Sequence, residues 1–357
     1  MEYDASLARK LLEPGELIDL NGLTVECKPV PDGDGRAALD PRALEIELDM
    51  AREMSRRQGV PSIDEMREQM GGFNRNLCRR ELYTRYIEVP TSCGIVPVWG
   101  YYPRHMGTGR PGLVYVHGGA FFGGTPFTVE NPCRLIADEA DCVVWNVEYS
   151  LAPEHPFPIP CTQVYEVAAY LHEHAGRFGM DGEKIALAGD SAGGNLCAAA
   201  AQMDRDKGTN YIRAQALLYA KLTFTNHELP GYKRDETLFE IVPEQRELLP
   251  GMLHIGSDES NAGDERVYVQ GLCDIREPYI SPAFGDCSGL PQALIILAEY
   301  DGLRLEGEFY AQKLQEAGVP VRVLRYRGVC HGFFDRLGTL PQAEAAALEI
   351  AALLRKL

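Results

Sequence analysis

A serine stands at the tip of a sharp turn in the sequence Gly189-Asp190-Ser191-Ala192-Gly193. The apolar residues 185–188 before it predict a strand, and the small residues after it predict a helix. Glycine on both sides lets the backbone fold tightly enough to present the Ser191 hydroxyl, which is the form of a nucleophile elbow. The pentapeptide alone is weak evidence because glycine and serine are common residues. The question is therefore whether the rest of an acyl-transfer site is present.

An acid and a base follow Ser191 in the order that such a site requires. Acyl transfer by serine needs a base that accepts the hydroxyl proton and a group that orients the base. Asp301 and His331 each come directly after an apolar run that predicts a strand. Because the carboxyl ends of parallel strands share one edge of a sheet, the order favours Ser191, Asp301 and His331 as a catalytic triad. Asp335 and Glu299 are the alternatives for the orienting acid.

The sequence His117-Gly118-Gly119-Ala120 offers donors for an oxyanion, which is the remaining requirement. It follows the strand expected at 112–116, and successive small residues expose backbone N–H groups. We therefore expect Gly118 and Gly119, with a third N–H from Ala192, to form the oxyanion hole. A glycine-rich loop could instead bind phosphate, but neither a G-x-G-x-x-G nor a G-K-[ST] pattern follows it.

Strands that alternate with helices must position these residues. Several apolar runs are continuous, which is typical of strands buried on both faces of a parallel sheet between helix layers. The first two expected strands are separated by a short turn and resemble a hairpin. The sequence thus predicts an α/β fold with an eight-stranded, mostly parallel sheet and an antiparallel entry. The expected strands lie near 81–89, 95–102, 112–116, 142–149, 185–188, 214–219, 293–299 and 321–326, and the main helices near 161–177, 191–204, 304–317 and 341–354.

Two segments do not follow this alternation. Residues 1–78 are charged, with amphipathic helices expected at 43–58 and 62–70. Residues 222–280 contain several Pro and Gly residues, and a long insertion at this edge of a sheet usually forms a lid or a wall of the site. We expect an N-terminal helical cap segment at 1–78 and a catalytic domain at 79–357, to which 222–280 adds a cap or active-site wall.

Composition and charge exclude several classes of protein. The net charge of −17, without a basic run, argues against binding to nucleic acid or to an anionic membrane. The ten cysteines form no Cys-x-x-Cys pair, which gives no support to a zinc site, and they do not have the density of a secreted disulfide scaffold. The N-terminus has no pattern of a signal peptide, and no apolar run is long enough to span a bilayer. These features predict a cytoplasmic protein with free thiols.

Taken together, the motifs resemble the hormone-sensitive-lipase family of α/β-hydrolases, the carboxylesterases also called bacterial family IV. The resemblance runs from about residue 80 to the end. It rests on the His-Gly-Gly loop at 117–119, the Gly-Asp-Ser-Ala-Gly-Gly-Asn elbow at 189–195, the sequence Tyr-Ser-Leu-Ala-Pro-Glu at 149–154 and the His-Gly-Phe at 331–333. Two departures are Ala120, where the family commonly has glycine, and Gly302, where it commonly has proline after the acid.

The resemblance implies a function and a site. Ser191 would be the nucleophile, His331 the base and Asp301 the acid, with the oxyanion held by the loop and Ala192. A helical cap would come from the N-terminal segment and the insertion, no metal or cofactor would be needed, and a homodimer could form through the last strand and helix. The expected substrates are small-molecule esters with short acyl chains of about two to six carbons.

The pocket and the reaction leave alternatives open. Phe121 and Phe122, next to the oxyanion loop, either wall a small acyl pocket or belong to the core. The same triad would serve an amidase such as an arylformamidase, or a lactonase. A non-catalytic binder of this fold, like the plant gibberellin receptor, lacks the catalytic histidine, whereas His331 is present here.

Overall fold

The structure is a computed structural model that describes residues 3–56, 59, 61–105 and 107–357. Its strands are β1 Glu16–Leu20, β2 Leu23–Lys28, β3 Leu82–Thr91, β4 Gly94–Pro103, β5 Arg110–Val116, β6 Val143–Val147, β7 Met180–Asp190, β8 Ile212–Leu218, β9 Gln292–Tyr300 and β10 Val321–Cys330. Its α-helices are α1 Ala5–Lys10, α2 Pro41–Arg56, α3 Ile63–Gln69, α4 Glu130–Ala140, α5 Ile159–Glu173, α6 Ala192–Asp206, α7 Pro250–His254, α8 Asp258–Tyr268, α9 Arg304–Glu316 and α10 Pro341–Leu354. Six short 3₁₀ helices lie at Pro126–Val129, Ala175–Phe178, Glu236–Leu238, Pro243–Leu248, Pro282–Phe284 and Phe333–Arg336.

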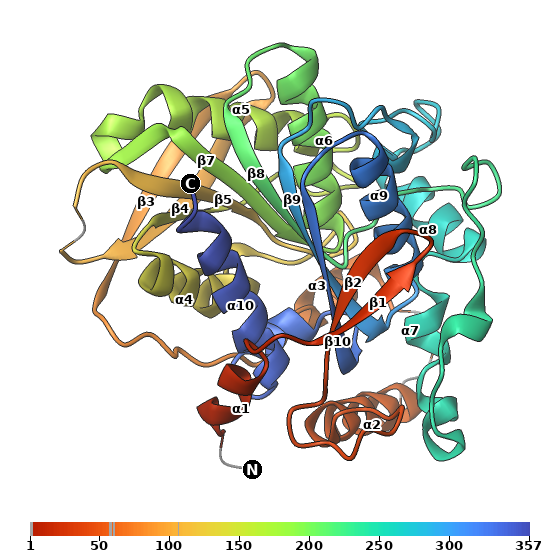
Figure 1. Cartoon of the computed structure of the whole chain (residues 1–357). Helices are drawn as coiled ribbons and strands as arrows, with labels where there is room; N and C mark the ends of the chain where they lie inside the picture. Colours follow the sequence, from red (N-terminus) through yellow and green to blue (C-terminus); the bar gives the residue numbers. More distant parts are fainter. Residues whose placement is uncertain (1–2, 57–58, 60, 106) are drawn as a thin grey trace.

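One central sheet organises the molecule (Figure 1). It has ten strands in the order β1-β2-β10-β9-β8-β7-β5-β6-β4-β3. The strands from β5 to β10 pair in parallel, and the β3–β4 hairpin joins the sheet antiparallel to β6. This confirms the α/β-hydrolase architecture and all eight expected strands, while the expected strand count is too low by two.

Alternate residues of each central strand feed two cores because successive side chains point to opposite faces of a sheet. In β5, Val114 and Val116 belong to the core that includes residues of α5, α6 and α9, whereas Leu113 and Tyr115 belong to the core that includes residues of α4 and α10. All four side chains are fully buried. The continuous apolar runs of the sequence thus reflect strands covered on both faces.

The N-terminal segment is only partly the helical cap that the sequence predicts. Residues 16–28 form the antiparallel hairpin β1–β2, and β2 pairs in parallel with β10, so this part extends the sheet. The prediction of a helical cap segment was wrong for these residues, because alternation over five or six residues is a weak signal. Helices α2 and α3 are present as expected, although residues 57–58, which the sequence assigns to the end of the first helix, lie outside the described residues.

The hairpin also changes the expectation of a homodimer. Pairing through the last strand needs a free edge on β10, but β2 and β9 occupy its two sides. The edge strands of the sheet are β1 and β3 instead. A homodimer therefore stays a prediction, but it cannot form through the edge of β10, which β2 covers.

The insertion after β8 and the helices α2 and α3 flank the edge where the parallel strands end (Figure 1). Between β8 and β9 the chain forms only short helices, of which α8 has 11 residues. Side chains of α2, of α7 and of the segment after β10 line one shared cavity, which places these elements next to His331. The insertion and the N-terminal helices therefore supply walls for whatever lies at the ends of β7, β9 and β10.

Candidate active site

The turn between β7 and α6 holds Ser191 in a conformation that few residues adopt. Its φ is +54° and its ψ is −119°, outside the regions that L-residues prefer. A Cβ on Gly193 would lie 2.0 Å from the Val116 carbonyl oxygen, and one on Gly189 would lie 2.5 Å from the Gly193 carbonyl oxygen. The two glycines are thus required by close backbone contacts, and the strained Ser191 backbone places the hydroxyl at the start of α6.

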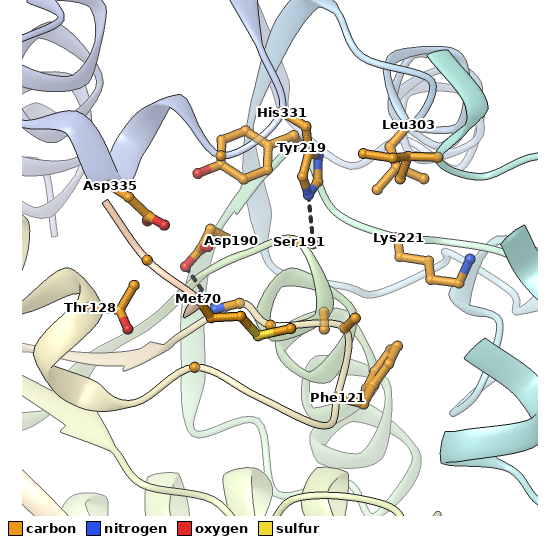
Figure 2. Close-up of a pocket in the computed structure, with 18 of the residues that line it drawn as sticks. Met70, Phe121, Thr128, Asp190, Ser191, Tyr219, Lys221, Leu303, His331 and Asp335 are labelled. Atoms are coloured by element: carbon orange, nitrogen blue, oxygen red, sulfur yellow. Dashed lines mark hydrogen bonds between the residues drawn. The ribbon is translucent and has the colours of Figure 1, made fainter. Parts of the chain in front are cut away.

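The three residues expected to form a triad lie in one hydrogen-bonded chain (Figure 2). The distance from Ser191 Oγ to His331 Nε2 is 2.9 Å, and that from His331 Nδ1 to Asp301 Oδ2 is 2.7 Å. Asp301 is fully buried, and its other oxygen accepts from the Leu303 N–H at 2.9 Å. These contacts fix both the tilt of the imidazole ring and the position of the carboxylate.

The two alternative acids are placed elsewhere. Glu299 points away and accepts a hydrogen bond from the Gly328 N–H at 2.9 Å. Asp335 forms no hydrogen bond with His331 or with any other described side chain. Asp301 is therefore the carboxylate that contacts the imidazole, although the sequence left three choices open.

The electrostatics of the site raise the pKa of the His331 imidazole. Burial lowers the pKa of His331, but the charge of Asp301 and the hydrogen bond to it outweigh this effect and raise the pKa above its ordinary value. Asp190 and Asp335 raise it further. A proton accepted from Ser191 would thus be stabilised on the ring.

The loop after β5 corrects one predicted donor of the oxyanion hole. The Gly118 N–H is occupied because it donates to Asp190 Oδ1 at 3.1 Å. In the described part of the chain, the N–H groups of Gly119, Ala120 and Ala192 have no acceptor. Gly119 has a φ of +131° and Ala120 a φ of +50°, so the backbone at these positions turns out of its usual regions. The available donors are therefore one residue further along the loop than the sequence analysis placed them.

Asp190 is a site residue that sequence reasoning passed over. Its Oδ1 accepts from the Tyr115 hydroxyl at 3.0 Å and from the Gly118 N–H, which ties the oxyanion loop to the nucleophile elbow. Burial raises the pKa of Asp190 to about 6, and the two hydrogen bonds act in the opposite direction. The signal for this role was available, since Asp190 lies directly before the nucleophile in the elbow.

A cavity of about 330 Å³ opens at Ser191, and Figure 2 shows its walls. Phe121 lines this cavity, fully buried and stacked on Tyr268 of α8 at 4.0 Å between ring centroids. Phe122 is not among the lining residues, and its carbonyl oxygen instead accepts from Arg67 Nε at 2.6 Å. Cap elements contribute the remaining walls, which include Met70, Gly71, Ile255, Ser260 and Asp264.

No metal site or membrane helix accompanies this cavity in the described residues. Within those ranges, no group of three or more His, Cys, Asp or Glu side chains is arranged to hold a metal ion. None of the helices described there is both long and apolar enough to cross a membrane. All ten cysteines are free thiols.

Fold and site together define an α/β-hydrolase with a Ser-His-Asp array at the carboxyl edge of its sheet. Residues 113–335 match the family model described as alpha/beta hydrolase fold, and the chain belongs to this family. The esterase LipI of Mycobacterium tuberculosis is 30% identical over 320 residues, covering 88% of this chain and 93% of the relative. The carboxylesterase NlhH of the same species is 34% identical over 270 residues, covering 73% of this chain and 79% of the relative.

A solved structure agrees with these relatives. The hyperthermophilic esterase from the archaeon Pyrobaculum calidifontis superimposes with a TM-score of 0.75 at 33% identity, over 89% of this chain and 98% of that one. The resemblance to the hormone-sensitive-lipase group of carboxylesterases is thereby confirmed. The chain is a carboxylic ester hydrolase.

Proposed function

We propose that the protein hydrolyses short-chain acyl esters through an acyl-enzyme formed on Ser191. The observation that carries this proposal is the continuous chain from Ser191 Oγ through the imidazole to Asp301, with heavy-atom distances of 2.9 and 2.7 Å. These distances lie within the range for direct proton transfer between a nucleophile, a base and its orienting acid.

The first half of the reaction forms the acyl-enzyme. His331 Nε2 accepts the hydroxyl proton as Ser191 Oγ attacks the ester carbonyl carbon, and Asp301 stabilises the imidazolium through Nδ1–H. When the tetrahedral intermediate collapses, the bond to the alcohol oxygen breaks and the imidazolium gives its proton to the leaving alcohol. Water then attacks the acyl-enzyme with His331 again as base, which releases the carboxylic acid and restores Ser191.

The oxyanion of both intermediates would be held by the N–H groups of Gly119, Ala120 and Ala192. Their freedom from other acceptors supports this assignment, and the bond between Asp190 and Gly118 would hold the loop in place before substrate binds. Ala120 keeps its N–H while its methyl group lines the cavity, which narrows the space beside the reacting carbon.

The size of the cavity supports the preference for short acyl chains. Its volume of about 330 Å³ lies at the small end of ligand pockets, and the stacked Phe121 and Tyr268 side chains close one wall. Acyl chains of about two to six carbons are expected to react best, because each additional methylene beyond the pocket contributes little binding.

Substitution of Ser191 tests the proposal directly. In Ser191→Ala, kcat on p-nitrophenyl acetate should fall by about 10⁴-fold or more, and labelling by a fluorophosphonate probe should vanish. The exposed Ser55, changed to alanine, serves as the matched control and should keep both. Substantial turnover by Ser191→Ala would contradict the triad.

A series of p-nitrophenyl esters of increasing acyl chain length tests the substrate preference. A maximum at ten or more carbons would contradict the short-chain preference, and amide and lactone substrates in the same panel decide the reaction class.

A further inference from the structure

The end of the cavity formed by Asp190, Asp335 and Tyr219, called here the carboxyl end, takes no direct part in bond making or breaking in the reaction above, although Asp190 also holds the oxyanion loop. All three residues line the cavity that opens at Ser191. In Figure 2 they lie together on one side of Ser191, with Lys221 and Phe121 on the other side. The cavity therefore has a carboxyl end and a separate wall formed by Phe121 and the cap.

Asp190 keeps one free oxygen toward this end. Both of its hydrogen bonds, from the Tyr115 hydroxyl and the Gly118 N–H, end on Oδ1. Its Oδ2 accepts no hydrogen bond from the residues that the structure describes. Asp190 can thus hold the oxyanion loop with one oxygen and contact a ligand with the other.

Asp335 has no partner of its own within the described ranges. Its Oδ1 is buried without a hydrogen bond, and no Lys, Arg or His side chain described there lies within ion-pair distance of its carboxylate. Burial and the negative charge of Asp190 raise the pKa of Asp335, while Arg336 and His331 act in the opposite direction. The two carboxyl groups are thus close enough to influence each other strongly.

The Tyr219 hydroxyl is a third polar group without a partner. Tyr219 is fully buried, its hydroxyl forms no hydrogen bond, and Figure 2 shows the oxygen on the side of the ring that faces Asp335 and Asp190. The ring of Tyr219 also packs edge-on against the His331 imidazole, with 4.9 Å between the ring centroids. A buried polar group without a partner is costly unless something binds it.

The cationic groups nearby do not satisfy this cluster. Lys221 is engaged at the opposite end, where its ammonium group donates to Asn261 and pairs with Asp264. Arg336 forms no ion pair in the part of the chain that the structure describes. The carboxyl end thus has carboxyl oxygens without donors and lacks a donor with positive charge.

We propose that the carboxyl end binds a protonated amine carried by the ester substrate, held by Asp190 Oδ2, Asp335 and the Tyr219 hydroxyl. An ammonium group supplies both the hydrogen-bond donors and the charge that the cluster lacks. An adjoining cavity of about 160 Å³ shares Asp335 and His331 and gives room for substituents on the nitrogen. The inference rests on the proposed function, since the amine must be part of a molecule that Ser191 attacks.

Pairs of esters that differ only in the amine test this assignment. On the alcohol side, 2-(dimethylamino)ethyl acetate is compared with 3-methylbutyl acetate. On the acyl side, ethyl 4-(dimethylamino)butanoate is compared with ethyl 5-methylhexanoate. For each pair, the ratio is kcat/KM of the amine ester divided by kcat/KM of the hydrocarbon ester. This ratio is measured in the wild type and in Asp335→Asn, and comparing the two proteins cancels the different chemical reactivities of the two esters. For at least one pair, Asp335→Asn should lower the ratio about tenfold or more, because a charge-assisted hydrogen bond is lost.

Two further measurements separate binding from a loss of folding. Tyr219→Phe keeps the ring against His331 and should lower the same ratio severalfold. Propylammonium should inhibit hydrolysis of p-nitrophenyl acetate competitively in the wild type. Asp34→Asn, at an exposed position, is the matched control and should keep the wild-type ratio.

The outcomes distinguish the subsite from the triad. Equal ratios in the wild type and Asp335→Asn for both pairs, with both esters hydrolysed, would overturn the amine subsite and leave the esterase intact. The amine subsite would also be overturned if Asp335→Asn lowered kcat/KM for glycerol monoacetate, a neutral diol ester, more than it lowered kcat/KM for the amine esters. Failure of the wild type to hydrolyse any of these esters, together with absence of fluorophosphonate labelling, would instead count against the proposed function.

Discussion

Two helices that border the same cavity differ sharply in how they are held. Of the 15 residues of α6, which begins at the nucleophile, 13 are buried. Helix α3, which leads to Met70 on the cap side, has no buried residue. The reacting groups are therefore fixed by the core of the molecule, whereas the cap wall depends on a few polar contacts. Changes to the first region should affect every ester equally, and changes to the second should affect turnover less.

The largest effect is expected from the acid of the triad. Asp301→Asn should lower kcat by about 10³–10⁴-fold for all esters, because the imidazole loses the charge that stabilises its protonated form. The pH dependence of activity should change as well. Since His331 must be neutral to act as base and its pKa is raised in the wild type, activity falls as the pH drops through that raised pKa. In Asp301→Asn the residual activity should survive to lower pH, as pH–rate profiles of kcat/KM would show.

Glu299→Gln is the matched control for this prediction. Glu299 is the rival carboxylate two residues earlier, and glutamine keeps an oxygen that can accept from the Gly328 N–H. Its loss of kcat should be far smaller than that of Asp301→Asn. Equal losses of kcat in the two variants would show that catalysis does not depend on the Asp301–His331 contact.

A smaller effect is expected where the two regions meet, at Arg67 of α3. Its side chain donates to the Phe122 and Ala152 carbonyl oxygens and binds Glu154 through two hydrogen bonds. Arg67→Ala should free the segment that follows the oxyanion donors and lower kcat about tenfold, with KM little changed. Arg52→Ala on α2, an exposed arginine whose ion pair in the described residues is with Asp49, should have no such effect. If Arg67→Ala raises KM alone, the residue shapes binding and does not position the loop.

The last prediction concerns stability and leaves the chemical step untouched, at the point where the insertion leaves the sheet. Glu306 of α9 accepts from the Leu222 and Thr223 N–H groups, and burial raises its pKa to about 7. Because this folded pKa lies above the unfolded value, Glu306 destabilises the fold progressively as the pH rises from about 4.5 to about 7. Glu306→Gln should remove that dependence. The difference in free energy of unfolding between Glu306→Gln and the wild type should therefore shift in favour of the variant by up to about 3 kcal/mol as the pH rises across this window. Urea unfolding at several pH values measures the difference, and parallel pH curves would contradict it.

Prediction from the sequence succeeded where local signals were strong. The continuous apolar runs gave the eight central strands, and chain order with strand ends selected Ser191, Asp301 and His331, which the structure brings together. It was wrong for residues 16–28, whose short strands depend on pairing with β10, a distant segment of the chain. It also missed that Gly118 donates to Asp190, because this bond joins the loop after β5 to the end of β7, 72 residues away.

The sequence by itself determined the chemistry of this protein: a serine in a glycine-flanked elbow, with an acid and a histidine at later strand ends. These signals are local, since they arise from backbone conformation and from the alternation of side chains along a strand. Only the tertiary structure decided which N–H groups are free for an oxyanion and which edge of the sheet is covered. It also brought Asp335 and Tyr219 beside Asp190. Each of these depends on contacts between distant segments, for which a single sequence carries no local pattern.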